Sequence, residues 1–350
     1  MTLSETIRQI QPLSERAMNA AWRRWDSIAK PLRSLGKLEQ AIVQIAGIQR
    51  SANVCIEKKG LIIMCADNGV VEEGVTQSGQ DVTAIVAENF LDEKSCVAIM
   101  CRETGTGIFP VDIGMAVDTP RVEKHKIAYG TKNIVKEPAM TREQAIAAIE
   151  VGIEKTVELK KDGYRILATG EMGIGNTTTS SAMTAVFLGT TAAEVTGRGA
   201  GLSTEGLNRK IASIERAIAL HHPDPDDPID VLSKVGGLDI AGLTGVFLGG
   251  AACGIPVVVD GFISAVAALT AVRIAPACAP YILASHVSKE PAAKMLLRAL
   301  QKSAFLICDM HLGEGTGAVA LFPLLDLASG IYRKMSTFDE VEFDTYVPLT

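Results

Sequence analysis

The chain has 350 residues, of which 47% are hydrophobic and 21% are charged, and its formal net charge is −6. This length is sufficient for a substantial core, in one large domain or in one large and one small domain. The sequence contains no block of Lys and Arg. This argues against nucleic acid as the main partner, because the phosphate backbone is bound by clustered cations.

The seven cysteines form neither a CxxC pair nor a cluster with histidines, and their number is odd. They are typical of small buried hydrophobic residues in a reducing compartment. The N-terminal segment is polar and has no apolar signal core, and no uninterrupted apolar stretch is long enough to span a bilayer. We therefore predict a cytoplasmic protein with no membrane partner.

Apolar residues recur at helical and strand spacings along the chain. Up to residue 162 they predict helices over 17–28, 38–48, 81–90 and 140–162, and strands over 60–66 and 107–113. Beyond residue 162 they predict strands over 164–168, 255–260 and 280–285 and helices over 207–220, 238–250, 292–300 and 318–332. Clustered glycines predict loops over 196–202 and 308–317. A capping box of Thr141 and Gln144 marks the start of the helix over 140–162.

Predicted strands alternate with predicted helices, and the strands are continuous apolar runs. This pattern predicts an α/β fold with a parallel sheet covered by helices on both faces. Ligands of such sheets gather at the carboxyl ends of the strands. The polar residues found there are Asp67, Asp112, Glu171, Asp260 and His286. Asp67 and Asp260 can bind a ribose or a metal, or they can cap loops. His286 is either a ligand contact or a capping residue.

The segment over 164–186 is typical of a strand, a glycine-rich loop and a helix N-terminus. Its glycines and first polar residues are Gly170, Gly173, Gly175, Asn176 and Thr177. Free backbone N–H groups and the positive end of the helix dipole suit an anion there. The loop matches neither GxGxxG nor GxxxxGK[ST], and an ordinary tight turn is the alternative. Glu171 lies in this predicted turn. Its carboxylate would repel a phosphate unless it serves the sugar, a partner cation or the reacting centre.

Glu314 lies between Gly313 and Gly315, ahead of an apolar helix. It is either an acid that stabilises the helix N-terminus or a general base whose pKa is raised by apolar neighbours. Lys210 and Arg198 are candidates for binding a phosphate or carboxylate, and the alternative for each is a solvated surface charge. The chain has no HxxH or HExxH motif and no GxSxG elbow. We therefore predict neither a metal nor a cofactor.

Seven segments together resemble one family: ADNGVVEEGVTQSGQDVTA, ATGEMGIGNTTTSSA, TGRGAGL, DVLSKVGGLDIAGLTGVFLG, VDGFISAVAAL, SHVSKE and LGEGTGA. This is the family of nicotinate-nucleotide:5,6-dimethylbenzimidazole phosphoribosyltransferases, which make the lower-ligand nucleotide of cobamides. The resemblance covers roughly residues 20–335, and GEMGIGNTT and LGEGTGA are specific when found together in this order.

The resemblance implies a reaction in which nicotinate mononucleotide and an aromatic base give an α-linked ribotide and free nicotinate. It also implies a Rossmann-like large domain over 51–317, a small helical domain built from 1–50 and 318–350, and a dimer. A Rossmann-type dehydrogenase is the first rival, and the chain lacks the GxGxxG turn that such an enzyme requires.

The same resemblance assigns roles to individual residues. Glu314 matches the general base, and Glu171 and Lys210 match other functional polar positions. The residues that match the lining of the base pocket are Ser78, Met172 and Leu312. The backbone N–H groups over 173–178, which include Gly173, Gly175, Asn176 and Thr177, are expected to hold the 5′-phosphate.

Four positions in three segments depart from the family pattern. Asn68 replaces a histidine, Leu32 and Arg33 replace a Pro-Gly pair, and Val86 replaces a glutamine near the base pocket. These changes lie on the acceptor side, so we expect an altered acceptor: another benzimidazole, a purine or a phenol joined through oxygen. Some relatives that activate phenols are heterodimers of two paralogous chains. This chain is thus a homodimer or one half of a heterodimer, and a catalytically weak paralogue that stabilises an active partner is the second rival.

Overall fold

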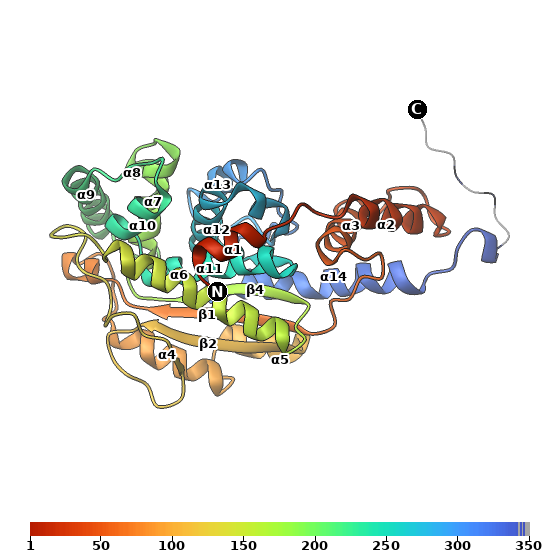
Figure 1. Cartoon of the computed structure of the whole chain (residues 1–350). Coiled ribbons are helices and arrows are strands. Elements are labelled where there is room, and N and C mark those ends of the chain that lie inside the picture. Colours follow the sequence, from red (N-terminus) through yellow and green to blue (C-terminus); the bar gives the residue numbers. More distant parts are fainter. Residues whose placement is uncertain (342–343, 345, 347–350) are drawn as a thin grey trace.

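The structure of the chain, a computed structural model, describes residues 1–341, 344 and 346. Its centre is a six-stranded sheet in the order β3-β2-β1-β4-β5-β6, and every neighbouring pair of strands is parallel (Figure 1). The strands are β1 (Lys59–Ala66), β2 (Thr106–Gly114), β3 (Glu123–Lys124), β4 (Ile166–Met172), β5 (Val257–Val259) and β6 (Ile282–Ala284). The predicted α/β class is confirmed.

The helices lie on both faces of this sheet. In chain order they are α1 (Leu3–Gln9), α2 (Glu15–Ser27), α3 (Lys37–Gln49), α4 (Asp81–Leu91), α5 (Cys96–Thr104), α6 (Arg142–Lys161), α7 (Asn176–Leu188), α8 (Ala192–Val195), α9 (Thr204–His221), α10 (Pro228–Val235), α11 (Leu238–Cys253), α12 (Phe262–Ile274), α13 (Ala293–Ala299) and α14 (Thr316–Lys334). Short 3-10 turns cover Gly69–Glu73, Pro276–Tyr281 and Asp339–Val341.

Strand β1 shows how the sequence divides the core between the two faces. All eight of its residues are buried. Ile62 and Met64 pack into the cluster that contains α6, α11 and α12, whereas Leu61 and Ile63 pack into the cluster that contains α3, α5 and α14. Successive side chains of a strand point to opposite faces, so a continuous apolar run fits a sheet covered on both sides.

Helices α6 and α11 approach each other so closely that glycine is required at the contact. A Cβ on Gly152 would clash with the carbonyl oxygen of Gly242, and a Cβ on Gly245 would clash with that of Ile149. The run of small residues in α11 therefore sets the short distance between the two helices. The capping box of Thr141 and Gln144 at the start of α6 is confirmed.

One turn lies elsewhere than predicted, and helices α5, α8 and α10 were not predicted. Gly170 and Glu171 belong to β4, where Glu171 pairs with Met64, and the turn begins only at Gly173. Helix α10 was not predicted, although Pro228 occupies its first turn, where the fixed φ and missing N–H of proline are well tolerated.

The order of the strands reverses beside β1. The chain runs from β1 outward to β2 and β3, then returns to β4 on the other side of β1 and continues outward to β6. In open α/β sheets, ligands bind in the crevice at the carboxyl ends of the strands where the order reverses. The loops that follow β1 and β4 therefore mark the expected place of the site.

Helices α2, α3 and the last turns of α14 extend beyond the sheet (Figure 1). The Trp25 and Tyr332 rings lie 5.1 Å apart, and Arg24 donates to the carbonyl oxygens of Tyr332 and Met335. Helix α1 lies elsewhere, since the N–H of Leu3 donates to Glu150 of α6. The division into residues 1–50 with 318–350 and residues 51–317 stays a prediction.

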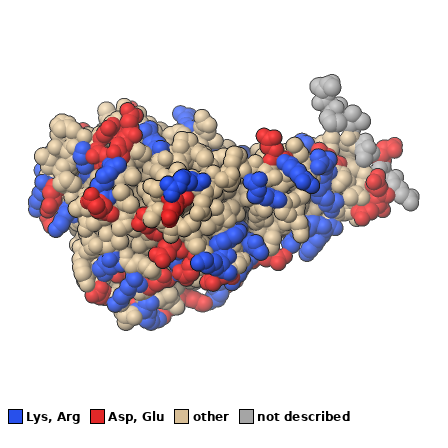
Figure 2. Space-filling view, viewed as in Figure 1, with Lys and Arg blue, Asp and Glu red and all other residues tan. Residues whose placement is uncertain are grey.

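The surface carries both signs of charge. Figure 2 shows Lys and Arg interspersed with Asp and Glu over the face in view. Among the residues that the structure describes, no helix combines the length and the apolar character needed to cross a membrane.

Candidate active site

A small cavity of about 90 Å³ opens between the loop after β4 and the loop over 196–202. It brings together seven of the residues that the sequence selected: Ser78, Gly173, Gly175, Asn176, Thr177, Arg198 and Lys210. We call it the anion pocket, for the reasons that follow. Gly175 has φ +96°, and a Cβ on Gly173 would clash with the carbonyl oxygen of Ala66, so both positions require glycine.

The backbone N–H groups over 173–178 are not equivalent. Those of Ile174, Asn176 and Thr178 donate to protein acceptors at 3.2, 3.2 and 2.9 Å. Within the part of the chain that the structure describes, the N–H groups of Gly175 and Thr177 have no protein acceptor. They lie at the start of α7, where the helix dipole favours negative charge. These two N–H groups of the expected set are therefore available to a phosphate.

Lys210 supplies the cation of the anion pocket. It comes from α9, and its Nζ donates to Thr177 Oγ1 at 2.8 Å and to the carbonyl oxygen of Gly197 at 3.2 Å. The residue is only 1% exposed, and this burial lowers the pKa of Lys210 to about 8. Arg198 also lines the pocket, and its guanidinium donates to the carbonyl oxygen of Leu202 and to Thr204 Oγ1, so it holds the loop over 196–202.

A second cavity, the acidic cavity, adjoins the anion pocket and is lined by Glu171, Asp260, His286, Ser288, Glu290 and Leu312, among others. Glu171 is buried, and Asn176 Nδ2 donates to its Oε2. Burial, together with the negative charge of Asp239, raises the pKa of Glu171 well above its usual value. Burial also lowers the pKa of His286, which favours the neutral imidazole.

Asp67 and Asp260 have structural partners. Asp260 accepts the N–H groups of Gly315, Gly317 and Ala318 at 3.2, 2.7 and 3.0 Å and so holds the start of α14. Asp67 accepts Thr83 Oγ1 at 2.5 Å and the N–H of Ala116 at 2.8 Å. The geometry supports the capping alternative for both aspartates.

Glu314 has an unusual backbone conformation. Its φ is +61°, in the left-handed region, and it stands between two glycines with φ values of +93° and +96°. A non-glycine residue in such a conformation costs about 1–3 kcal/mol and often marks a functional position. A Cβ on Gly170 would clash with the carbonyl oxygen of Glu314, so the loop lies directly against β4.

The carboxyl group of Glu314 is partly buried and faces the N–H of Val97 at the start of α5. Burial raises its pKa, and the Val97 N–H opposes this effect. Its Oε2 is buried and has no hydrogen-bond partner among the described residues. A carboxylate with a raised pKa and a free oxygen is suited to accept a proton.

The residues predicted to line the base pocket lie in three places. Ser78 lines the anion pocket. Leu312 is 57% exposed and lines a wide cleft of about 730 Å³ together with Cys96, Met100 and Met310. Val86 and Met172 pack against the apolar cluster of α4, α5 and α14, as Met100 does. The single chain therefore does not bring these four residues into one cavity.

Sequence reasoning missed two acids of the site, the buried Asp239 and the half-buried Glu290. Asp239 follows Gly236 and Gly237 at the start of α11, and Glu290 ends the segment SHVSKE. Glu290 lines both the acidic cavity and the wide cleft. An acid that closely follows a glycine pair at the start of a buried helix was the available signal for Asp239. Among the described residues, no group of three or more His, Cys, Asp and Glu side chains could hold a metal ion.

A family model described as phosphoribosyltransferase matches residues 10–342, and this is the class of enzyme that the fold and the site define. The chain is 49% identical to the nicotinate-nucleotide–dimethylbenzimidazole phosphoribosyltransferase of Ruminiclostridium cellulolyticum, over the whole of both chains. It is 46% identical to the enzyme of that name from Chloroflexus aggregans, over 97% of each chain. The crystal structure of CobT from Thermus thermophilus superposes with a TM-score of 0.90 at 36% identity, covering 95% of this chain and all of the other.

The chain therefore belongs to the nicotinate-nucleotide–dimethylbenzimidazole phosphoribosyltransferase family. The resemblance found in the sequence is confirmed, and so is its assignment to the pentosyltransferases. The dehydrogenase alternative is excluded by the same comparisons.

Proposed function

We propose that this chain transfers the phosphoribosyl group of nicotinate mononucleotide to an aromatic lower-ligand base, which gives an α-ribotide and nicotinate for cobamide synthesis. One arrangement carries the proposal: a pocket with two free amides and a buried lysine follows β4, and the loop that packs on Gly170 of the same strand presents a carboxylate with a raised pKa. The names of the relatives supply the two substrate classes.

In this scheme the 5′-phosphate binds to the N–H groups of Gly175 and Thr177 and to Lys210. The acceptor nitrogen forms a bond to C1′, and the C1′–N bond of the nicotinate breaks with its electron pair returning to the pyridinium nitrogen. Nicotinate leaves as a neutral ring, so no metal is needed to stabilise it. The proton of the acceptor passes to Glu314, and attack from the opposite face converts the β-linkage to an α-linkage.

The acceptor is a benzimidazole, a purine or a phenol. Val86 supports a changed acceptor, because it packs with apolar residues where a glutamine would present an amide. The test is a panel of these bases with nicotinate mononucleotide, with release of nicotinate as the readout. Release with at least one base supports the function, and release with none overturns it. If Val86 sets the choice, V86Q shifts turnover toward dimethylbenzimidazole. Turnover by the unaltered enzyme with dimethylbenzimidazole alone would refute an altered pocket.

The active assembly is a homodimer or a heterodimer with a paralogous chain. Ser78, Val86, Met172 and Leu312 do not share one cavity in the single chain, which supports completion of the acceptor pocket by closure or by a second chain. Turnover by the chain purified alone argues for the homodimer. Turnover that appears only with a paralogue argues for the weak-subunit alternative.

A further inference from the structure

Asn176 joins two buried carboxyl groups at the start of α7. Its side-chain nitrogen donates to Oε2 of Glu171 and, at 2.9 Å, to Oδ2 of Asp239. The three residues are 7%, 5% and 0% exposed in the order Glu171, Asn176 and Asp239. An amide nitrogen carries two protons, so this one is fully used by the two acids. The bridge connects β4, α7 and α11.

No cation neutralises this pair. Among the described residues, neither Glu171 nor Asp239 forms an ion pair with a Lys, Arg or His side chain. The other ionisable groups around the pair are mostly acidic. On the sheet and the loops after its strands they are Cys65, Asp67, Asp112 and Asp260. Around the acidic cavity they are His286, Glu290 and His311, and Glu314 lies on the loop next to it. Two carboxylates linked only by a neutral amide in this setting are not both ionised at low cost.

The two acids differ in what stabilises their negative charge. Asp239 lies in the first turn of α11, where its own N–H and that of Ile240 face its carboxylate. Glu171 lies in a strand, where the N–H of Glu314 is the backbone group that stabilises its charge. Burial raises the pKa of Asp239 to about 6, and burial together with the charge of Asp239 raises the pKa of Glu171 well above its usual value. The helix N-terminus thus directs the negative charge to Asp239 and the proton to Glu171.

We propose that Asp239 is a positioning residue for the transfer reaction: through Asn176 it fixes Glu171 and keeps that carboxyl group protonated in the acidic cavity. The inference rests on the proposed function. Oε1 of Glu171 lies against the Cα of Gly313, so the same contacts also set the position of the loop that carries Glu314.

A protonated Glu171 has two consequences for the chemistry. It adds a hydrogen-bond donor to a cavity whose other acids offer acceptors, which suits a sugar hydroxyl that both donates and accepts. It also cannot take the proton of the incoming base. The proton transfer is therefore left to Glu314, whose Oε2 is free among the described residues.

The test measures the protonation of Glu171 directly. Infrared difference spectra between the unaltered enzyme and E171Q show the carbonyl stretch of a protonated carboxyl group if the proposal holds at neutral pH. In D239N the loss of a neighbouring negative charge lowers the pKa of Glu171, so this band disappears at a pH lower by about one unit. The matched control is D226N, which removes an exposed carboxylate far from the site.

Kinetics provide the second readout. Activity falls as pH rises through the pKa of Glu171, so D239N moves this basic limb of kcat/KM to lower pH. On that limb, kcat/KM falls about tenfold if the pKa of Glu171 decreases by one. Deprotonation of Lys210 also lowers activity as the pH rises, and the infrared band distinguishes the titration of Glu171 from that of Lys210. An unmoved band in D239N overturns the proposal. So does an ionised Glu171 in the unaltered enzyme at neutral pH, a result that requires no Asp239 variant to fold.

The two proposals fail in different ways. If the band is present and moves in D239N but no base accepts the phosphoribosyl group, the proposed function is wrong and the protonation stands. If turnover occurs and the band is absent, the role of Asp239 is wrong and the function stands.

Discussion

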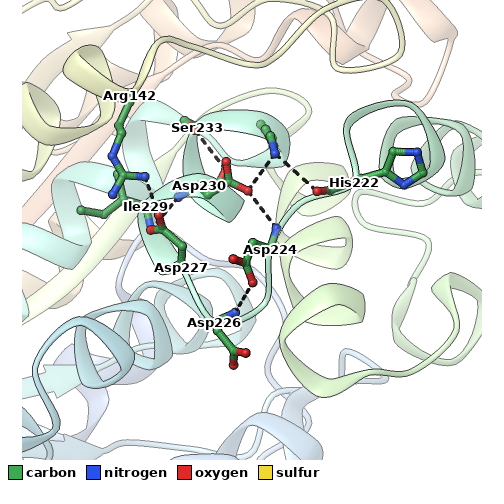
Figure 3. Close-up of polar contacts among 9 residues, drawn as sticks. Arg142, His222, Asp224, Asp226, Asp227, Ile229, Asp230 and Ser233 are labelled. Atoms are coloured by element: carbon green, nitrogen blue, oxygen red, sulfur yellow. Dashed lines mark hydrogen bonds and ion pairs between the residues drawn. The ribbon is translucent and has the colours of Figure 1, made fainter.

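Two groups of acids in this molecule are built in opposite ways. The first lies on the surface over 222–230, in the segment HPDPDDP and the start of α10 (Figure 3). There Asp227 accepts the N–H groups of Ile229 and Asp230, both at 3.1 Å, and pairs with Arg142 at 2.7 Å. Asp230 pairs with Lys234 at 2.9 Å and accepts the N–H of Asp224 at 2.8 Å. These aspartates have partners that stabilise their charge.

The second group, Glu171, Asp239, Glu290 and Glu314, is buried or half-buried and gathers around the end of β4. Glu171 and Asp239 share one amide, and oxygens of Asp239, Glu290 and Glu314 have no hydrogen-bond partner in the described chain. Burying an unpaired carboxylate costs free energy, and groups kept in this state are candidates for function. The comparison teaches that acid content alone does not mark a site. What marks it here is burial without a cation.

Among substitutions in the two groups of acids, Glu314→Gln is expected to have the largest effect on activity. The amide cannot accept the proton of the incoming base, so kcat falls about 10²- to 10⁴-fold while KM for nicotinate mononucleotide changes little. Steady-state kinetics with the best base from the panel provide the measurement. Unchanged turnover would show that the base lies elsewhere.

The same variant also tests stability, with the sign fixed by the raised pKa of Glu314. The folded chain binds this proton more tightly than the unfolded chain, so the residue destabilises the fold as pH rises through its folded pKa. E314Q removes that dependence. We expect its Tm to exceed that of the unaltered enzyme by an amount that grows with pH, measured by thermal unfolding across a pH series. A constant difference contradicts this account.

Lys210→Met comes next in size. It removes the cation of the anion pocket, and a hydrogen bond to a charged group contributes about 1.5–3 kcal/mol, so KM for nicotinate mononucleotide rises roughly 10- to 100-fold. Because the pKa of Lys210 is about 8, the KM of the unaltered enzyme should itself rise above that pH, and the KM of K210M should not. K161M is the matched control, since Lys161 is exposed at the end of α6 and lines neither the anion pocket nor the acidic cavity. An equal KM effect from K161M would remove the distinction.

Local patterns were sufficient for much of this architecture. Continuous apolar runs predicted the parallel sheet, and glycines around Glu314 predicted a carboxylate held at the start of a helix. The hydrogen bonds between side chains of the site could not be predicted from the sequence. Asn176 and Asp239 are 63 residues apart in the chain, and Lys210 and Thr177 are 33 residues apart. Such contacts depend on which strand ends the fold brings together, and no local spacing encodes them.

The misplaced turn has a similar cause. Glycine and glutamate over 170–171 suggested a turn, but β4 continues because it pairs with β1 on one side and the Glu314 loop packs directly on Gly170. Tertiary packing thus overrides the local preference. The missed α10 is different, because Asp227 before Pro228 is a recognisable helix start that the acidic, proline-rich context obscured.

Asp227→Ala is the smallest effect and tests the other side of the comparison. It removes the side-chain cap of α10 and the pair with Arg142, so the free energy of unfolding falls by about 1 kcal/mol, mostly through the lost cap. D227N keeps an oxygen that can cap the helix but loses the ion pair, and it should recover most of that loss. Denaturant unfolding measures both variants, and neither should change kcat or KM. A change in kinetics from D227A would mean that the surface acids communicate with the site. In that case, the contrast between partnered and unpartnered carboxylates would not be sufficient to locate function.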